Sequence, residues 1–198
     1  MIPPRISGWE ADDLDLLTQA PRHAELVDGA LIFRISPQRS WHARLVENLT
    51  FALRQAAPAG FDAEREMTVR LDKKSRPEPD ILVTTAPYDP DRTRYAPEGV
   101  ALVIEVVSEE SADRDRFLKP FKYAQARIPH FWRLEDETGA PTVHTYELDT
   151  MTSTYVATGI HRNRLKVFVP IPIPIPIPIP LDLDLDLDLD LDLDSLVP

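Results

Sequence analysis

The chain has 198 residues, 43% of them hydrophobic and 28% charged, which suits one globular domain with a sizeable core. It contains no cysteine, so disulfides and thiolate metal sites are excluded, and a metal ion must be held by oxygen or imidazole ligands. No apolar run approaches the roughly 20 residues that a membrane span needs, and the N-terminus lacks a signal-peptide pattern. We therefore expect a cytoplasmic protein without membrane association.

The net charge of −11 argues against a general nucleic-acid binder, because such proteins are usually basic. Seven of the negative charges are aspartates at alternate positions from Asp182 to Asp194, and without them the rest of the chain carries only −4. An acidic active site would itself supply part of that charge. The charge balance weakens a DNA-binding function without excluding it.

The first predicted elements are a short helix and a hairpin. Residues 8–19 carry acids in their first turn and follow Ser7, a good N-cap, which predicts the helix. In residues 24–36 apolar positions alternate on either side of Asp28-Gly29, a pair that favours a tight turn. This pattern predicts a β-hairpin.

A long amphipathic segment follows. In residues 38–57 large apolar side chains recur every four positions and Pro58 comes just after the end, which predicts a long helix. Residues 61–71 alternate well enough for a strand, and residues 80–85 form an apolar strand. Residues 86–99 are rich in Pro, Asp and Arg and predict an exposed loop.

The strongest strand lies in the middle of the chain. Residues 100–108 are nearly continuously apolar, as expected of a strand buried on both faces. Residues 111–126 predict a helix in which Pro120 either bends the axis or marks the effective start. Three more strands are predicted at residues 130–135, 142–148 and 154–160. We expect an α/β (α+β) fold with a central mixed β-sheet flanked by helices, preceded by the N-terminal helix and hairpin.

The end of the chain has low complexity. Residues 170–180 alternate Pro and Ile, which removes every second backbone donor, and residues 181–194 alternate Leu and Asp. The Leu-Asp period of two could form a two-faced strand, but carboxylates gathered on one face would repel one another. We expect residues 1–169 to form the domain and residues 170–198 to be a poorly ordered or edge-associated tail.

Two acids are candidates for metal chemistry. Glu105 interrupts the apolar run at residues 100–108, where a carboxylate is costly to bury without a partner. A solvent-facing glutamate or a buried salt bridge would explain it equally well. Asp80 opens its strand directly after Pro79, and alone it is an ordinary turn aspartate. If the two strands pair, the acids converge as the oxygen pair that Mg²⁺ or Mn²⁺ requires.

A basic residue completes the pattern. Lys119 and Lys122 lie on the helix predicted after the Glu105 strand. A lysine aimed at a metal site could orient a water molecule or stabilise the developing charge of a phosphate. Most helix lysines extend into solvent, so this assignment depends on the acids. The pattern indicates a metal-dependent phosphodiesterase.

Five short motifs occur in a distinctive order: ELVDGAL (25–31), PDILV (79–83), LVIEVVS (102–108), DRFLKPFKYA (115–124) and IPHFW (128–132). Together they resemble the Uma-two family of putative restriction endonucleases, part of the PD-(D/E)XK nuclease superfamily. The resemblance covers roughly residues 10–169. It implies a restriction-endonuclease-like core and a Mg²⁺-dependent (or Mn²⁺-dependent) endonuclease that hydrolyses phosphodiester bonds of DNA.

The resemblance also implies roles for individual residues. The first acid of the superfamily falls on Asp80 and the second on Glu105, and these two carboxylates with the backbone carbonyl of Val106 would hold the metal ion. The superfamily lysine, two residues after the second acid, would fall at Val107. Its role is assigned instead to Lys119 on the following helix.

Other matching positions have a functional and a structural interpretation. Glu25 is either a further acid of the site or a strand glutamate bonded to a neighbour, and His42 is either a ligand or base or a helix histidine packed on the core. Asp115 is expected to cap or brace the helix, and Tyr123 to be a core aromatic.

An alternative to the enzyme is a catalytically inactive nuclease fold that binds or assembles with a partner, which the acidic charge and Val107 favour. Cutting both DNA strands with one small domain would usually require a homodimer. The two hypotheses differ in whether the chain binds a metal ion.

Overall fold

A computed structural model describes residues 6–17, 21, 23–34, 37–137, 140–162, 164–170 and 186–192. Its centre is a six-stranded sheet. In their order across the sheet the strands are β10 (Thr154–Arg162), β9 (Ala140–Asp149), β8 (His130–Glu137), β7 (Val100–Val106), β5 (Ile81–Thr84) and β3 (Asp62–Arg65). All neighbouring strands are antiparallel except β7 and β8, which are parallel. The predicted mixed sheet is therefore confirmed.

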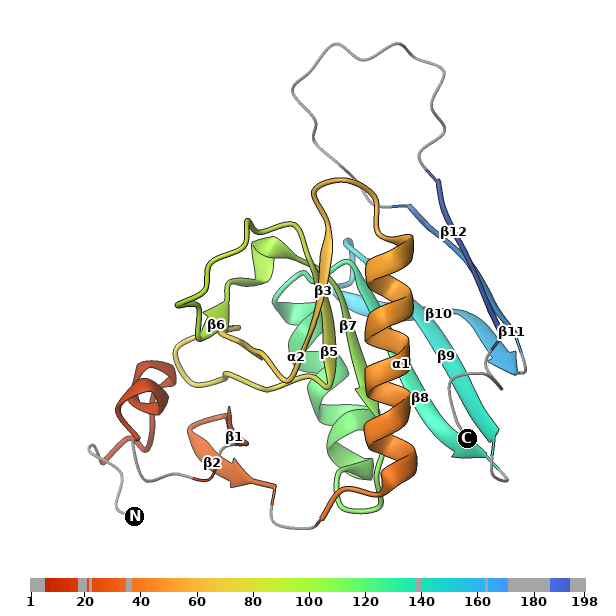
Figure 1. The fold of residues 1–198 in the computed structure, drawn as a ribbon. Coiled ribbons are helices and arrows are strands. Elements are labelled where there is room, and N and C mark those ends of the chain that lie inside the picture. Colours follow the sequence, from red (N-terminus) through yellow and green to blue (C-terminus); the bar gives the residue numbers. More distant parts are fainter. Residues whose placement is uncertain are drawn as a thin grey trace, which may run out of the picture.

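Helices cover both faces of this sheet (Figure 1). Helix α1 (Ser40–Ala56) packs on one face, where alternate strand residues such as Ile81, Ile104 and Trp132 meet its leucines. Helix α2 (Lys119–Gln125) packs on the other, where the intervening positions, Leu82, Val103 and Phe131, form a second core with Tyr123. Because side chains alternate along a strand, a sheet that is apolar on both faces produces the continuous apolar runs seen in the sequence.

The strand register positions the two acids. Ile81 is paired with Ile104 in the antiparallel β5–β7 ladder, so the residues just before and just after them, Asp80 and Glu105, are neighbours on adjacent strands. Glu66 has a positive φ of 55° and its N–H donates to the carbonyl of Asp80 at 3.1 Å. This break divides the predicted strand 61–71 into β3 and β4 (Thr68–Val69).

The parallel crossover from β7 to β8 carries the second helix. It begins with the π-helical turn η3 (Arg114–Leu118), which runs directly into α2. Pro120 is the second residue of α2 and directly follows the π-helical turn, whose backbone N–H groups bond five residues back, as that of Lys119 does to Arg114. Pro120 therefore marks the change from the π-helical turn to the α-helix and not a free helix start.

At the N-terminus the hairpin is confirmed as β1 (Ala24–Val27) and β2 (Ala30–Phe33), with Asp28 and Gly29 both at positive φ. The predicted end of the hairpin, residues 35 and 36, lies outside the described residues. Two hydrogen bonds between Leu26 and Arg76, at 3.0 and 2.7 Å, attach β1 to the rest of the chain.

A short helix lies within the predicted residues 8–19, but it is shorter than predicted and its cap is not Ser7. It is a 3₁₀ helix, η1 (Ala11–Leu16), and its last predicted residues, 18 and 19, lie outside the described part. Gly8 adopts a φ of 84°, which separates Ser7 from the helix, and Glu10 takes the cap position, where its N–H donates to Asp13 at 2.8 Å. The reciprocal hydrogen bonds between Glu10 and Asp13 thus define the start of the helix, although serine is by itself the more favourable N-cap residue.

The loop predicted at residues 86–99 also contains regular structure. The short strand β6 (Arg94–Tyr95) pairs in parallel with β4, and η2 (Pro97–Gly99) precedes β7. Tyr95 is buried in the core on the α2 face, and this burial makes the segment more ordered than its composition predicts.

In the C-terminal region β11 (Arg164–Pro170) pairs antiparallel with β12 (Asp186–Asp192), so part of the Leu-Asp run does form a strand. The register sets Lys166 opposite Asp190 and Arg164 opposite Asp192. Residues 171–185 and 193–198 lie outside the described residues, and the boundary at residue 169 stays a prediction. Among the described residues, no helix is long and apolar enough to cross a membrane.

Candidate active site

A buried group of charged side chains lies between β7 and α2. The Lys119 ammonium is at its centre, 3.1 Å from Glu105 Oε2, 3.2 Å from Glu25 Oε1 and 3.4 Å from Asp115 Oδ1. The hydroxyl of Tyr123 donates to the other oxygen of Glu105 at 2.6 Å. We call these five residues the inner cluster. None of them is more than 7% exposed.

Local sequence spacing brings the inner cluster together. Asp115, Lys119 and Tyr123 are four residues apart along η3 and α2, so their side chains lie on one helical face. That face is turned toward Glu105 on β7, the strand directly before the crossover. Glu25 comes from β1, on the separate hairpin. One face of one helix therefore gathers acids from two sheets.

Carboxylates outnumber cations in the inner cluster. Burial raises the pKa of Glu105 well above its usual value, and the nearby Asp115 and Asp80 add to the rise against the opposing effect of Lys119. Burial likewise raises the pKa of Asp115. Burial alone would lower the pKa of Lys119, but its carboxylate neighbours, led by Glu105, raise it well above normal. The ammonium therefore stays charged amid an excess of acid.

Asp80 lies at the edge of the inner cluster and is 2% exposed. Its Oδ2 accepts the backbone N–H of Val106 at 2.8 Å, and its Oδ1 is 3.3 Å from Arg34 Nη2 and 3.5 Å from His42 Nε2. Burial acts to raise the pKa of Asp80, but His42, Arg34 and Lys119 together lower it to about 2. Asp80 is therefore ionised at neutral pH.

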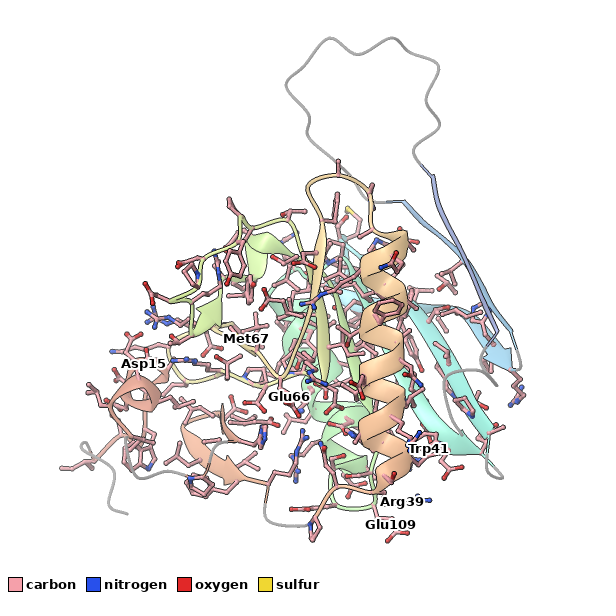
Figure 2. All side chains as sticks on the ribbon, viewed as in Figure 1. Asp15, Arg39, Trp41, Glu66, Met67 and Glu109 are labelled. Atoms are coloured by element: carbon pink, nitrogen blue, oxygen red, sulfur yellow. The ribbon has the colours of Figure 1, made fainter. Side chains whose placement is uncertain are left out.

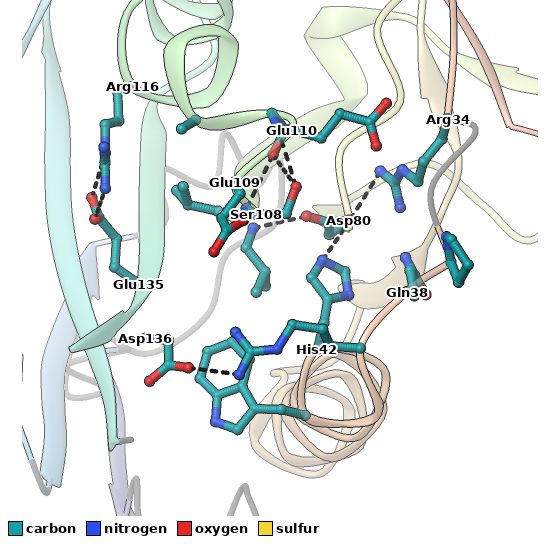
Figure 3. A pocket seen from close by; sticks show the side chains of 17 residues that line it. Arg34, Gln38, His42, Asp80, Ser108, Glu109, Glu110, Arg116, Glu135 and Asp136 are labelled. Atoms are coloured by element: carbon teal, nitrogen blue, oxygen red, sulfur yellow. Dashed lines mark hydrogen bonds and ion pairs between the residues drawn. The ribbon is translucent and has the colours of Figure 1, made fainter. Parts of the chain in front are cut away.

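A cavity of about 870 Å³ opens beside Asp80, and we call it the outer cavity. Figure 3 shows Asp80 between His42 and Arg34 on one side, with the ion pair of Arg116 and Glu135 on the other. Further lining comes from the start of α1 and the segment after β7, including Arg39, Trp41 and Glu109, which Figure 2 labels at one end of the molecule. Glu105 and Lys119 do not line the cavity.

The predicted site residues fall into two sets. Glu25, Glu105, Asp115 and Lys119 lie together in the inner cluster and Asp80 adjoins them, whereas His42 contacts Asp80 from the cavity side. Asp115 contacts Lys119 one turn further along the helix, and its predicted role in capping or bracing the helix stays a prediction. Val106 contacts Asp80 through its N–H, and a ligand role for its carbonyl stays a prediction.

The prediction that Tyr123 is a core aromatic is confirmed, and its buried hydroxyl in addition donates to Glu105. The spacing of four from Lys119 is the signal that could have revealed this contact.

Two residues of the site were not predicted. Arg34 contacts Asp80 across 46 residues of chain, and no local pattern marks it. Glu78 is buried two residues before Asp80, with one carboxylate oxygen 2.7 Å from His23 Nδ1. Burial raises the pKa of Glu78, although His23 opposes the rise. The spacing of two from Asp80 could have marked Glu78, since alternate residues of an extended segment lie on one side.

The donor set fits a hard divalent cation. All the acids offer oxygen ligands, and carboxylates exceed cations around Glu105, whereas the side chains that contact Asp80, Arg34 and His42, are basic. The buried Oε2 of Glu25 has no hydrogen-bond partner among the described residues. In that part of the chain no three His, Asp or Glu side chains are grouped closely enough to hold a metal by themselves.

The mixed six-stranded sheet with helices on both faces defines an α+β protein (Figure 1). The chain is similar to a solved structure described as a putative nuclease belonging to DUF820 from Anabaena variabilis ATCC 29413, with a TM-score of 0.58 at 15% identity, covering 84% of this chain and 88% of that one. No curated protein matches the chain. The model of the Uma2 family, described as "Putative restriction endonuclease", matches residues 10–174. The chain belongs to this family, as its motifs predicted.

Proposed function

We propose that this protein is a metal-dependent endonuclease that hydrolyses phosphodiester bonds of DNA. The observation that carries the proposal is the adjacency of Asp80 and Glu105 on paired strands, with the Lys119 ammonium 3.1 Å from Glu105. Nucleases of the restriction-endonuclease type generally work with divalent metal ions, and membership of the Uma2 family supports the same chemistry.

In this proposal Asp80, Glu105 and the carbonyl of Val106 hold Mg²⁺ or Mn²⁺. When bound, such an ion neutralises charge on the phosphate and makes a water molecule more acidic. His42 and Arg34 keep Asp80 ionised, and Tyr123 fixes the orientation of Glu105. Lys119 is held by three carboxylates and does not line the cavity, so in this arrangement it positions Glu105, and the phosphate contact predicted for it requires the inner cluster to open. The outer cavity admits the phosphodiester group to Asp80.

The test is cleavage of supercoiled plasmid DNA with Mg²⁺ or Mn²⁺ by the wild type and by Asp80→Asn and Glu105→Gln. Both substitutions keep side-chain size and remove an oxygen ligand, so each is expected to lower the rate about 100-fold or more. Glu147→Gln, an exposed acid on β9 of the same sheet, is the matched control and keeps the wild-type rate. Equal cleavage by all four proteins would refute the site assignment.

A second candidate is an inactive nuclease fold that binds or assembles with a partner. The specific observation in its favour is that Glu105 and Lys119 do not line the outer cavity. This candidate predicts neither cleavage nor affinity for Mg²⁺ or Mn²⁺.

For the active enzyme, cleavage of both DNA strands requires two copies of the site, and sedimentation of the protein on DNA would reveal the dimer.

A further inference from the structure

The cations around the outer cavity are not equivalent. Arg116 directs two guanidinium nitrogens at the carboxylate of Glu135, and Arg39 pairs with Asp136 at 3.2 Å. Both arginines are thus paired with acids of β8, away from Asp80, and Arg116 shares its partner Glu135 with Arg133. Lys119 is 2% exposed in the inner cluster. Within the described ranges, Arg34 is the cavity-lining arginine that contacts an acid of the proposed metal site.

Arg34 also has hydrogen-bonding capacity to spare. A guanidinium carries five N–H donors in a planar fork that matches the oxygens of a carboxylate or a phosphate. Arg34 contacts Asp80 through Nη2 alone, at 3.3 Å, and its buried Nη1 has no hydrogen-bond partner among the described residues. Its side chain is 25% exposed, against 3% for that of Asp80. Arg34 is therefore the more exposed partner of this ion pair.

The geometry points to a role that we propose here: Arg34 binds the phosphodiester group of the substrate in the outer cavity. The inference rests on the proposed function, because it takes the ligand to be a nucleic-acid phosphodiester. Two non-bridging phosphate oxygens fit the planar fork, and Asp80 holds the fork at the site where the bond is cut. Arg34 is then a substrate-binding residue and also the counter-ion of Asp80.

A purely structural role makes a different prediction. If Arg34 only neutralised Asp80, its loss would change protein stability and the turnover number but leave DNA affinity unchanged. If it binds phosphate, its loss weakens DNA binding in the absence of any metal and lowers the dependence of binding on salt. A contact kept equally in the ground and transition states also raises KM and leaves kcat little changed.

The experiment measures binding of a fluorescein-labelled DNA oligonucleotide by anisotropy, in EDTA, over a range of salt concentrations. Arg34→Met is expected to weaken binding about tenfold and to reduce the salt slope by about one phosphate contact. Arg34→Lys keeps the charge but loses the fork, so it retains the slope and recovers part of the affinity. It also covers the case in which Arg34→Met does not fold. Arg54→Met removes an arginine that pairs with Asp62 at 3.2 Å outside the cavity, and it binds DNA within about twofold of the wild type.

The outcomes separate this inference from the proposed function. DNA binding by Arg34→Met at wild-type affinity and slope overturns the role of Arg34, even if the wild type cuts DNA. Binding that depends on Arg34 without any cleavage supports the inference and refutes the nuclease proposal. A wild-type protein that neither binds nor cuts DNA refutes both.

Discussion

The inner cluster and the outer cavity are adjacent but differ in how their charged side chains are paired and exposed. In the inner cluster Lys119 is enclosed by three carboxylates, and its ammonium group is the counter-ion of Glu105. On the cavity side Asp80 shares one oxygen between Arg34 and His42 and lines the outer cavity. The inner cluster pairs its charges internally, whereas the outer cavity is the space through which a ligand would reach Asp80. Asp80 is the residue where the two meet.

The largest effect is expected when Lys119 is replaced by Met. This leaves buried carboxylates without their ammonium, so the free energy of unfolding should fall by about 3–5 kcal/mol. Lys122→Met, on the same helix, removes an ion pair with the exposed Asp28 and should lower it by less than about 1 kcal/mol. Urea unfolding of both variants measures the difference. Equal losses would show that the inner cluster does not depend on its internal cation.

A smaller effect is expected for Tyr123→Phe. The buried oxygen of Glu105 loses its 2.6 Å donor, which should lower the free energy of unfolding by about 2–3 kcal/mol. In Tyr155→Phe the lost hydroxyl bonds a neutral acceptor, the carbonyl of Ile128 at 2.9 Å, and the expected loss is about 1 kcal/mol. Thermal and urea unfolding check the order. A loss for Tyr155→Phe as large as for Tyr123→Phe would contradict a special role of the inner hydroxyl.

The ionised state of Asp80 is tested by pH. Its pKa in the folded protein, about 2, lies below the ordinary value of 3.8, so its charge contributes stability above pH 3.8 that is lost as the pH falls toward 2. The contribution is about 2 kcal/mol. The difference in unfolding free energy between the wild type and Asp80→Asn should shrink by this amount between pH 6 and pH 2. A difference that is constant over this range would mean that Arg34 and His42 do not hold the charge.

Local patterns predicted much of this molecule because the cause was local. Alternation and apolar runs defined the sheet, and Asp28-Gly29 defined the first hairpin. The pairing of β5 with β7 was the condition under which Asp80 and Glu105 would converge, and it is met. The split of strand 61–71 at Glu66 has no such pattern, since it depends on a bond to the backbone of Asp80.

Contacts between distant segments could not be predicted. Arg34 and Asp80 are 46 residues apart, and the attachment of the hairpin that carries Glu25 depends on Arg76. The burial of Lys119 was also not evident, because a helical lysine usually extends into solvent and only the three surrounding acids hold this one inside. The contact of Arg34 with Asp80 and the burial of Lys119 thus depend on ion pairs between distant segments, which sequence spacing does not reveal.

The most direct test of the central claim is a calorimetric titration with Mn²⁺ of the wild type, Asp80→Asn and Glu105→Gln. If Asp80, which lines the cavity, and Glu105, which lies in the inner cluster, hold one ion together, the wild type binds Mn²⁺ and each variant loses about tenfold or more in affinity. Wild-type affinity in Glu105→Gln would contradict the claim, because the inner cluster would then be structural and Asp80 alone would face the substrate.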